Sequence, residues 1–287
     1  ADTSTDKNMN MDTMPLRWGH FRVLIVASLG QITGAGLATL VGVILPMIQI
    51  FRHPGLTSLQ QGLVAATSLV GIMVGSVLFG AWSDKKGYLF FFRFCPALIL
   101  AASLFTFFTA DLFGLVTGLF FMGLGIGGGY SLDSDYISEI MPRRWKLLMV
   151  GVAKAASSLG SIAAAAICFS LLREWHDPHL WNRLLLLVAV MAVVMLLCRI
   201  RFEQSPGWLI AHGRISEAEK AVRYFLGPDV EIGEIRNRPN KTQMPKVAWS
   251  DLFKPGQVKK VIFGGIPWAC EGLGVYGIGV FLPVLVM

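Results

Sequence analysis

Seven long apolar stretches set what this sequence can fold into. Each reaches the length of about 20 mostly apolar residues that an α-helix needs to cross a bilayer. The stretches lie at 21–50, 61–82, 90–110, 112–136, 147–172, 181–200 and 259–287. Charged residues make up 15% of the chain, compared with about 25% in soluble domains, so much of the surface is expected to face lipid. The sequence therefore predicts an all-α, polytopic membrane protein.

Composition divides the chain into four regions. They are a polar, disordered N-terminus at 1–20, a six-helix transmembrane bundle at 21–200, a polar central loop at 201–258 and a seventh transmembrane helix at 259–287. Within the loop, Ile215–Leu226 has the apolar spacing of an amphipathic helix, and Ser216 with Glu219 matches a capping box at its start. We expect this short helix to lie at the cytoplasmic surface of the membrane.

The positions of the basic residues predict the orientation. With the N-terminus in the cytoplasm, most of the 25 Lys and Arg residues fall in cytoplasmic segments, whereas the outer segments hold Arg52, Arg173 and Arg183. This is the positive-inside pattern of a multi-pass protein, and we place it in a bacterial inner membrane. Nucleic-acid binding is disfavoured because the basic residues are spread over separate loops.

No cofactor or metal site is expected. The four cysteines lie in apolar runs without paired spacing, which favours free buried thiols over a disulfide framework or a zinc site. They are Cys95, Cys168, Cys198 and Cys270. His176 and His179 sit close together in an outer loop, where solvated side chains are a better interpretation than a metal site.

Four segments resemble the major facilitator superfamily. Residues 80–87 (GAWSDKKG) resemble its signature between helices two and three, Gly-x-x-x-Asp-Arg/Lys-x-Gly, although Tyr88 and Leu89 replace the basic pair that follows. Three further segments resemble the sugar-porter and organic-ion branch. They are 123–128 (GLGIGG), 136–144 (YISEIMPRR) and 203–210 (EQSPGWLI). The segments occur in the family's order and cover most of residues 20–285.

The resemblance implies a fold, a mechanism and a partner. The family has twelve helices in two pseudo-symmetric halves, so this chain corresponds to the N-terminal six-helix half, the central loop and helix seven. A six-helix half cannot enclose an alternating-access cavity, so we expect the C-terminal half of the transporter as a partner. The resemblance also assigns a conformational gate, in which Glu139 pairs with basic residues. Asp135 lies four residues before Glu139 and is expected to share its face of the helix. The gate residues are Gly80, Asp84, Lys85, Gly87, Asp135, Glu139, Arg143 and Lys146.

Lys154 is the predicted centre of the substrate site. In sugar porters a sugar-binding Gln follows the Pro of the Glu-x-x-Pro segment by twelve residues, which is Lys154 here, and the family's later Gly is present as Gly160. Lys154 lies about 12 Å along the helix from Lys146, a depth at which an ammonium group is costly unless it faces a cavity or a carboxylate. It therefore binds a substrate anion, pairs with Asp133 or Asp135, or extends to the membrane edge.

Two acidic residues are candidates for proton coupling. Asp133 and Asp135 point about 200° apart on their helix, and we expect Asp133 to face the cavity as the resting partner of Lys154. Glu271 lies in a Pro- and Gly-rich stretch typical of a broken helix beside a cavity. Proton-coupled phosphate porters carry an acid where this chain has Gly129, which argues against phosphate. The helix-one acid of many proton-coupled relatives is also missing, and Gln31, Thr33 and Thr39 are offered instead.

The leading functional prediction is a carrier for a small organic anion, coupled to protons or another ion. The predicted substrate-binding residues are Lys154, Gln31, Tyr130, Ser157, Trp268 and Tyr276. The alternatives are a sugar or polyol carrier and a non-transporting sensor or structural membrane protein. An enzyme is not expected, because the Gly-x-Gly-Asp motif of membrane aspartyl proteases is missing. ATP-driven transport is disfavoured because the sequence has no phosphate-binding Gly-x-x-x-x-Gly-Lys-Ser/Thr loop.

Overall fold

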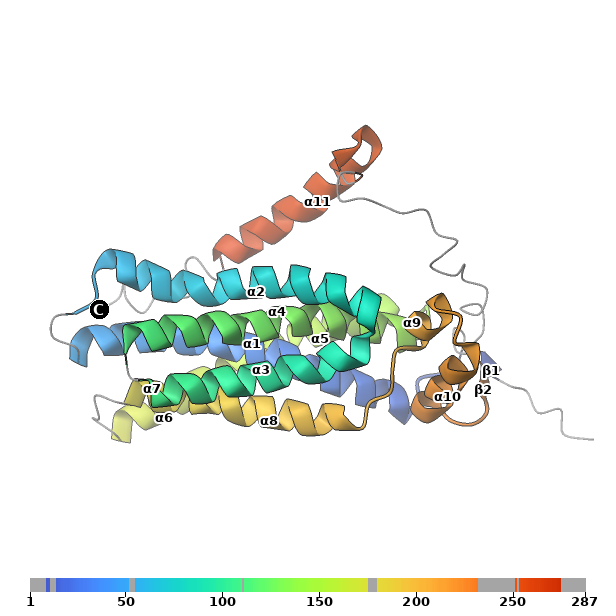
Figure 1. Ribbon diagram of the computed structural model, residues 1–287, viewed down its shortest axis with the longest axis horizontal. Helices are drawn as coiled ribbons and strands as arrows, with labels where there is room; N and C mark the ends of the chain where they lie inside the picture. Colours follow the sequence, from blue (N-terminus) through green and yellow to red (C-terminus); the bar gives the residue numbers. More distant parts are fainter. Residues whose placement is uncertain are drawn as a thin grey trace, which may run out of the picture.

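The computed structural model is a bundle of long helices running side by side (Figure 1). It describes residues 9–10, 14–51, 55–109, 111–174, 180–231, 251 and 253–274. Within these residues, five helical segments are long and apolar enough to cross a membrane, and one further apolar helix is shorter. The predicted all-α membrane fold is therefore confirmed.

The helices follow the predicted order with two interruptions. Their bounds are α1 Trp18–Phe51, α2 Ser58–Lys86, α3 Tyr88–Phe108, α4 Leu112–Ile140, α5 Lys146–Ala155, α6 Ser157–Glu174, α7 Leu180–Leu184, α8 Leu186–Ile200, α9 Pro206–Ala211, α10 Ile215–Leu226 and α11 Pro255–Gly272. The fifth predicted span is divided at Ala156 into α5 and α6, and the sixth at Leu185 into α7 and α8. The seventh predicted stretch, 259–287, overlaps α11, which is not among the helices apolar enough to span a membrane over its described part, and residues 275–287 lie outside that part.

Glycines bring α2 and α4 into backbone contact. A Cβ atom on Gly71 or Gly75 of α2 would lie 2.3 or 2.0 Å from a carbonyl oxygen of α4. In the other direction, a Cβ on Gly123 or Gly127 of α4 would lie 2.1 or 2.0 Å from a carbonyl oxygen of α2. The glycine run of α4 is therefore a packing surface, since only glycine lets two membrane helices approach this closely.

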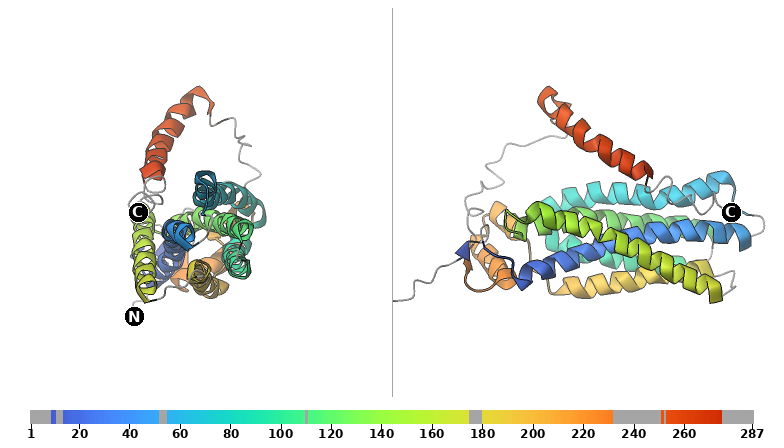
Figure 2. Two further views of the ribbon diagram at one scale, coloured as in Figure 1. Left: turned by 90° about the vertical axis from the view of Figure 1, so that its left-hand side faces the viewer. Right: turned by 180° about the vertical axis from the view of Figure 1, so that it is seen from behind.

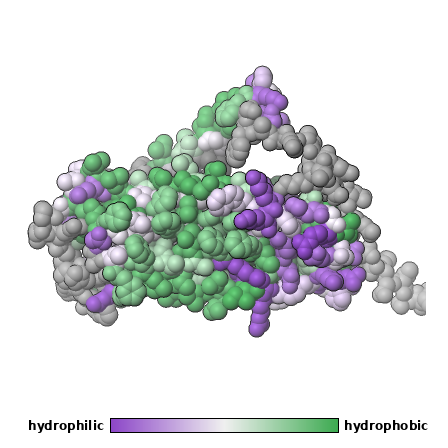
Figure 3. Space-filling view, viewed as in Figure 1, coloured by the Kyte–Doolittle hydropathy of each residue, from purple (hydrophilic) through white to green (hydrophobic). Residues whose placement is uncertain are grey.

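The apolar core lies between α1, α3, α4 and α8. It contains Leu40, Ile44, Ile99, Met122 and Ala192, each 2% exposed or less. The end view in Figure 2 shows the first helix surrounded by the others. Along the outside of the bundle, large apolar side chains remain exposed and form the green band of Figure 3. This band has the composition expected of a surface that faces lipid.

One end of the bundle carries α9, α10 and much of the polar surface in Figure 3. We call it the basic end, because the exposed residues Lys85, Lys86, Arg143 and Arg144 lie there. The prediction of an amphipathic helix at Ile215–Leu226 is confirmed as α10, whose apolar face is buried in one cluster with residues of α1, α3 and α4. The capping-box prediction is wrong, because the helix is capped at Arg214 without a side-chain hydrogen bond. Arg214 instead forms an ion pair with Glu217 at 2.5 Å.

The segment before α1 contacts the end of α10, which differs from the disorder expected over 1–20. Met9–Asn10 (β1) pairs in parallel with Val230–Glu231 (β2). The guanidinium of Arg17 donates to both carboxylate oxygens of Asp229, at 2.8 and 2.6 Å. These hydrogen bonds lower the pKa of Asp229 to about 2. Polar composition suggested disorder because it carries no information on partners this distant in sequence.

Candidate transport site

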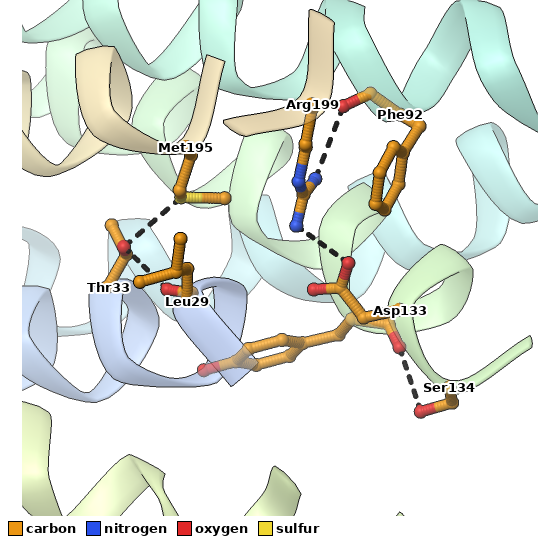
Figure 4. A network of polar contacts seen from close by, with 8 residues as sticks. Leu29, Thr33, Phe92, Asp133, Ser134, Met195 and Arg199 are labelled. Carbon is orange, nitrogen blue, oxygen red and sulfur yellow. Dashed lines mark hydrogen bonds and ion pairs between the residues drawn. The ribbon is translucent and has the colours of Figure 1, made fainter. Parts of the chain in front are cut away.

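A buried ion pair joins α4 to α8 (Figure 4). Nη2 of Arg199 lies 2.6 Å from Oδ1 of Asp133, and the two side chains are 0% and 1% exposed. Nη1 of Arg199 donates to the carbonyl of Phe92 at 3.2 Å, and the guanidinium lies 4.0 Å from the centroid of the Phe92 ring. Oδ2 of Asp133 and Nε of Arg199 have no hydrogen-bond partner among the described residues. Each member of the pair therefore has polar atoms that are hydrogen-bonded and one that is not.

A glycine of α1 makes room for this pair. A Cβ atom on Gly30 would lie 2.0 Å from Oδ2 of Asp133 and 3.3 Å from Nη2 of Arg199. Any side chain at this position would therefore collide with the carboxylate. The pair is enclosed by α1, α3, α4 and α8, and α1 contributes a surface without a side chain.

The prediction that Asp133 pairs with Lys154 is wrong, because Asp133 pairs with Arg199. Arg199 is the second-last residue of the sixth apolar stretch, 181–200, and its charge was counted with the cytoplasmic loop that follows. In the structure it lies in the last turn of α8 and its side chain is fully buried. The available signal was the buried acid itself, because an aspartate inside an apolar helix requires a cation and more than one basic residue can reach it.

Lys154 lies where α1, α4 and the α5–α6 helix meet. Its Nζ is 5.9 Å from the centroid of the Tyr130 ring, a distance suited to a cation–π interaction. The Tyr130 hydroxyl in turn packs against Gly34 of α1, where a Cβ would lie 2.0 Å from it. Lys154 is half-buried and is in electrostatic contact with Glu271 of α11. The structure therefore brings Lys154 and Tyr130 together, with Glu271 within electrostatic range of Lys154.

The other predicted substrate residues are placed less completely. Gln31 is buried on α1 beside Gly30, and Ser157 is half-buried at the start of α6. The side chain of Trp268 and all of Tyr276 lie outside the described part of the chain. Thr33 and Thr39 donate to carbonyls of their own helix at 2.7 and 3.1 Å. The Thr33 hydroxyl also lies 3.2 Å from the sulfur of Met195 on α8. Both hydroxyl groups are therefore engaged within the bundle.

Glu139 holds the start of α9 at the basic end. Its carboxylate accepts hydrogen bonds from the Ser205 hydroxyl and, at 3.1 Å, from the amide of Gly207. A Cβ on Gly207 would lie 2.6 Å from the Glu139 carboxyl carbon. Glycine at 207 therefore allows the carboxylate to approach the backbone directly.

A second set of contacts ties this segment to α2 and α3. The indole of Trp208 donates to the carbonyl of Asp84 at 3.2 Å, and the Asp84 side chain is hydrogen-bonded to Tyr88. The Gln204 side chain accepts from the amide of Leu89 at 2.9 Å, in the first turn of α3. Gly87 has a φ of 98°, and a Cβ there would lie 2.0 Å from the Gln204 amide nitrogen. The positive φ favours glycine at this turn, and the Gln204 side chain occupies the space that a Cβ would take.

Most of the predicted gate residues gather at the basic end. Asp135 is in electrostatic contact with Glu139, Asp84 and Lys146, which agrees with its expected grouping. Lys85 and Arg143 are exposed at this end, and Gly80 packs against Ser131 with room for a methyl group. The sequence analysis did not identify Gln204 and Ser205, because their contacts depend on which helix ends they reach in the fold. The gate roles of the predicted residues remain predictions.

No metal site is found in the described ranges, which hold no group of three His, Cys, Asp or Glu side chains suited to a metal ion. His176 and His179 fall outside those ranges, so the solvated-loop interpretation of that segment remains an expectation.

Comparison with known proteins assigns the chain to a family. Residues 16–271 match the family model described as "Sugar (and other) transporter", and the chain belongs to this family. The XylE proton:xylose symporter of the major facilitator superfamily, bound to 6-bromo-6-deoxy-D-glucose, superimposes with a TM-score of 0.67 at 20% identity, covering 76% of this chain and 52% of that one. The protein is therefore a multi-pass integral membrane protein with a major facilitator fold.

Two curated relatives are similar over most of the chain. The inner membrane metabolite transport protein YgcS of Escherichia coli (strain K12) is 29% identical over 226 residues, covering 79% of this chain and 50% of that protein. The arabinose-proton symporter of Bacillus subtilis (strain 168) is 28% identical over 214 residues, covering 73% and 46%. The chain thus spans about half the length of these relatives.

Proposed function

We propose that this chain forms the N-terminal half of a secondary carrier that moves a small organic anion by alternating access, coupled to protons. The observation that carries the proposal is the half-buried ammonium group of Lys154, held over the Tyr130 ring where α1, α4 and α5 meet. A cation at this depth is costly unless a counter-charge faces it. A substrate carboxylate provides such a charge, in competition with Glu271.

Proton coupling is assigned to the acids that lie beside these cations. Asp133 is buried against Arg199, and Glu271 is in electrostatic contact with Lys154. A carboxylate in a water-poor site can change its protonation when a neighbouring charge moves. The proton symporters among the similar proteins support coupling in this chain, and the positive-inside rule places the basic end in the cytoplasm.

A sugar or polyol carrier is the second candidate. It is favoured by the family's description and by the arabinose and xylose that the names of similar proteins specify. The two candidates differ in one chemical feature, a carboxylate on the substrate. D-glucuronate and D-glucose form a matched pair for this purpose, because they share a pyranose ring and differ at one carbon.

The experiment compares the binding and proteoliposome uptake of labelled D-glucuronate and D-glucose. An anion carrier should prefer glucuronate, and Lys154→Gln should weaken glucuronate binding by about tenfold or more, the effect of losing a charged hydrogen-bond partner. Lys260→Gln, an exposed lysine of α11, is the matched control. Preference for glucose, with glucuronate excluded, would support the sugar carrier. Binding without any uptake, measured with the C-terminal half of the carrier present, would favour a sensor.

A further inference from the structure

Two acidic side chains of α4 bind the same stretch of chain, residues 199–207, which we call the connecting segment. Asp133 holds its first residue through the ion pair with Arg199 at 2.6 Å. Further along α4, Glu139 holds its far end through Ser205 and Gly207. One acid is buried inside the bundle and the other lies at the basic end. The two attachments therefore join the interior of the protein to the predicted gate.

The connecting segment is supported along its length. The guanidinium of Arg93 donates to the carbonyls of Ile200 and Phe202 at 2.7 and 2.9 Å, which completes the end of α8. The hydroxyl of Tyr136 donates to the carbonyl of Glu203 at 3.2 Å. The segment is thus bonded to α3 and α4 between its two ends, and a displacement of Arg199 has a continuous path to Ser205.

Only one oxygen of Asp133 is used by this attachment. Oδ2 is buried against Gly30 and has no hydrogen-bond partner among the described residues. A proton on Oδ2 would neutralise the carboxylate and leave Arg199 as an uncompensated buried cation, a strongly unfavourable arrangement. Cys95 of α3 and Tyr136 of α4 are in electrostatic contact with members of the pair, and Nε of Arg93 on α3 lies 3.4 Å from the carbonyl oxygen of Arg199. Helix α1 presents a glycine to the pair.

We propose that Arg199 transmits the protonation of Asp133 to the cytoplasmic gate. Protonation of Asp133 releases Arg199, the connecting segment shifts, and Ser205 and Gly207 loosen their hold on Glu139. Arg199 is a positioning residue in this scheme and contacts no substrate. The inference rests on the proposed proton coupling and specifies the part of the protein that the proton moves.

Hydrogen exchange of the gate amides tests this without substrate. The amides of Gly207 and Trp208 donate to Glu139 and Ser205 at 3.1 and 3.2 Å, so their exchange reports the hold on Glu139. Exchange of a peptide spanning 205–211 is followed by mass spectrometry over a pH series and corrected for the intrinsic rate. Asp133→Asn should mimic the protonated acid, raise exchange at least about tenfold and remove the pH dependence seen in the wild type.

Two further variants keep the test decisive. Asp111→Asn alters an acid at the opposite end of α4, where asparagine also caps a helix, and should behave as the wild type. Asp133→Leu combined with Arg199→Met removes both charges, which folded proteins often tolerate, and should give fast, pH-independent exchange. The proposal would be overturned if the corrected exchange rate of the wild type did not depend on pH. It would also be overturned if Asp133→Asn exchanged at the wild-type rate.

These outcomes are separable from those of the carrier assay. Failure of glucuronate to bind leaves the exchange test unaffected, because no substrate is present. Conversely, pH-dependent glucuronate uptake together with unchanged gate exchange would retain the carrier and remove Arg199 from the coupling.

Discussion

Replacing Gly30 by alanine tests the enclosure of the buried ion pair. The new Cβ would lie 2.0 Å from Oδ2 of Asp133, whereas carbon and oxygen atoms touch at roughly 3.3 Å. The contact must therefore open by more than about 1 Å, either by moving α1 away from α4 or by turning the Asp133 carboxylate away from Arg199.

Each route has an estimated free-energy change. Separating the helices resembles overpacking, which destabilises by about 1–3 kcal/mol, and breaking a buried pair costs about 3–5 kcal/mol. Alanine is about 1 kcal/mol more favourable than glycine inside a helix, which offsets part of either. We therefore expect Gly30→Ala to lower the free energy of unfolding by about 0–4 kcal/mol, and by about 1–5 kcal/mol relative to alanine at a helical glycine that has open space around it.

The matched control is Gly151→Ala on α5, where a Cβ meets nothing within 4 Å. It should be neutral or stabilising by up to about 1 kcal/mol. Thermal and denaturant unfolding of the purified proteins in the same detergent compare the two directly. The reasoning is refuted if Gly30→Ala is as stable as Gly151→Ala, since the carboxylate would then have space that the structure does not give it.

Three other predictions follow from described contacts. Tyr130→Leu should weaken anion binding by about two- to fivefold through loss of the cation–π contact with Lys154, while Tyr130→Phe stays near the wild type in calorimetric titration. Gly207→Ala should separate Glu139 from the backbone and slow uptake with little change in equilibrium binding, and a loss of binding alone would contradict it. The contact of Asp229 with the segment before α1 should persist above the carboxyl's unfolded pKa of about 4 and be lost as the pH falls through its folded pKa of about 2. Acid-protease cleavage of that segment should rise over this window, and Asp229→Asn should raise it at every pH.

The pattern of residues predicted where the helices lie better than it predicted which segments contact one another. Apolar length locates spanning segments because the bilayer sets a fixed requirement, and helical periodicity located α10 because one face had to be buried. The break at Ala156 was not foreseen, since the stretch 147–172 contains no proline that would mark an interruption. Nor was the contact of Met9–Asn10 with Val230–Glu231, which depends on how the loop folds back.

The candidate site was predicted in type and only partly in pairing. The sequence indicated a buried lysine and a buried aspartate, and the energetic need for counter-charges was correct. It could not decide which cation serves Asp133, because Lys154 and Arg199 lie on different helices and their distances depend on packing. The same limit applies at the gate, where the hydrogen bonds of Glu139 with Ser205 and Gly207 were not foreseen.

The glycine contact between α2 and α4 has a practical consequence for measuring motion. Since backbone faces backbone along this seam, no side chain can change rotamer there to let one helix slide along the other. A pair of spectroscopic labels on the outer faces of α2 and α4 should therefore keep one separation in every conformation of the carrier. That fixed distance is an internal ruler, against which displacements of α1, α8 and the connecting segment can be read in the same sample.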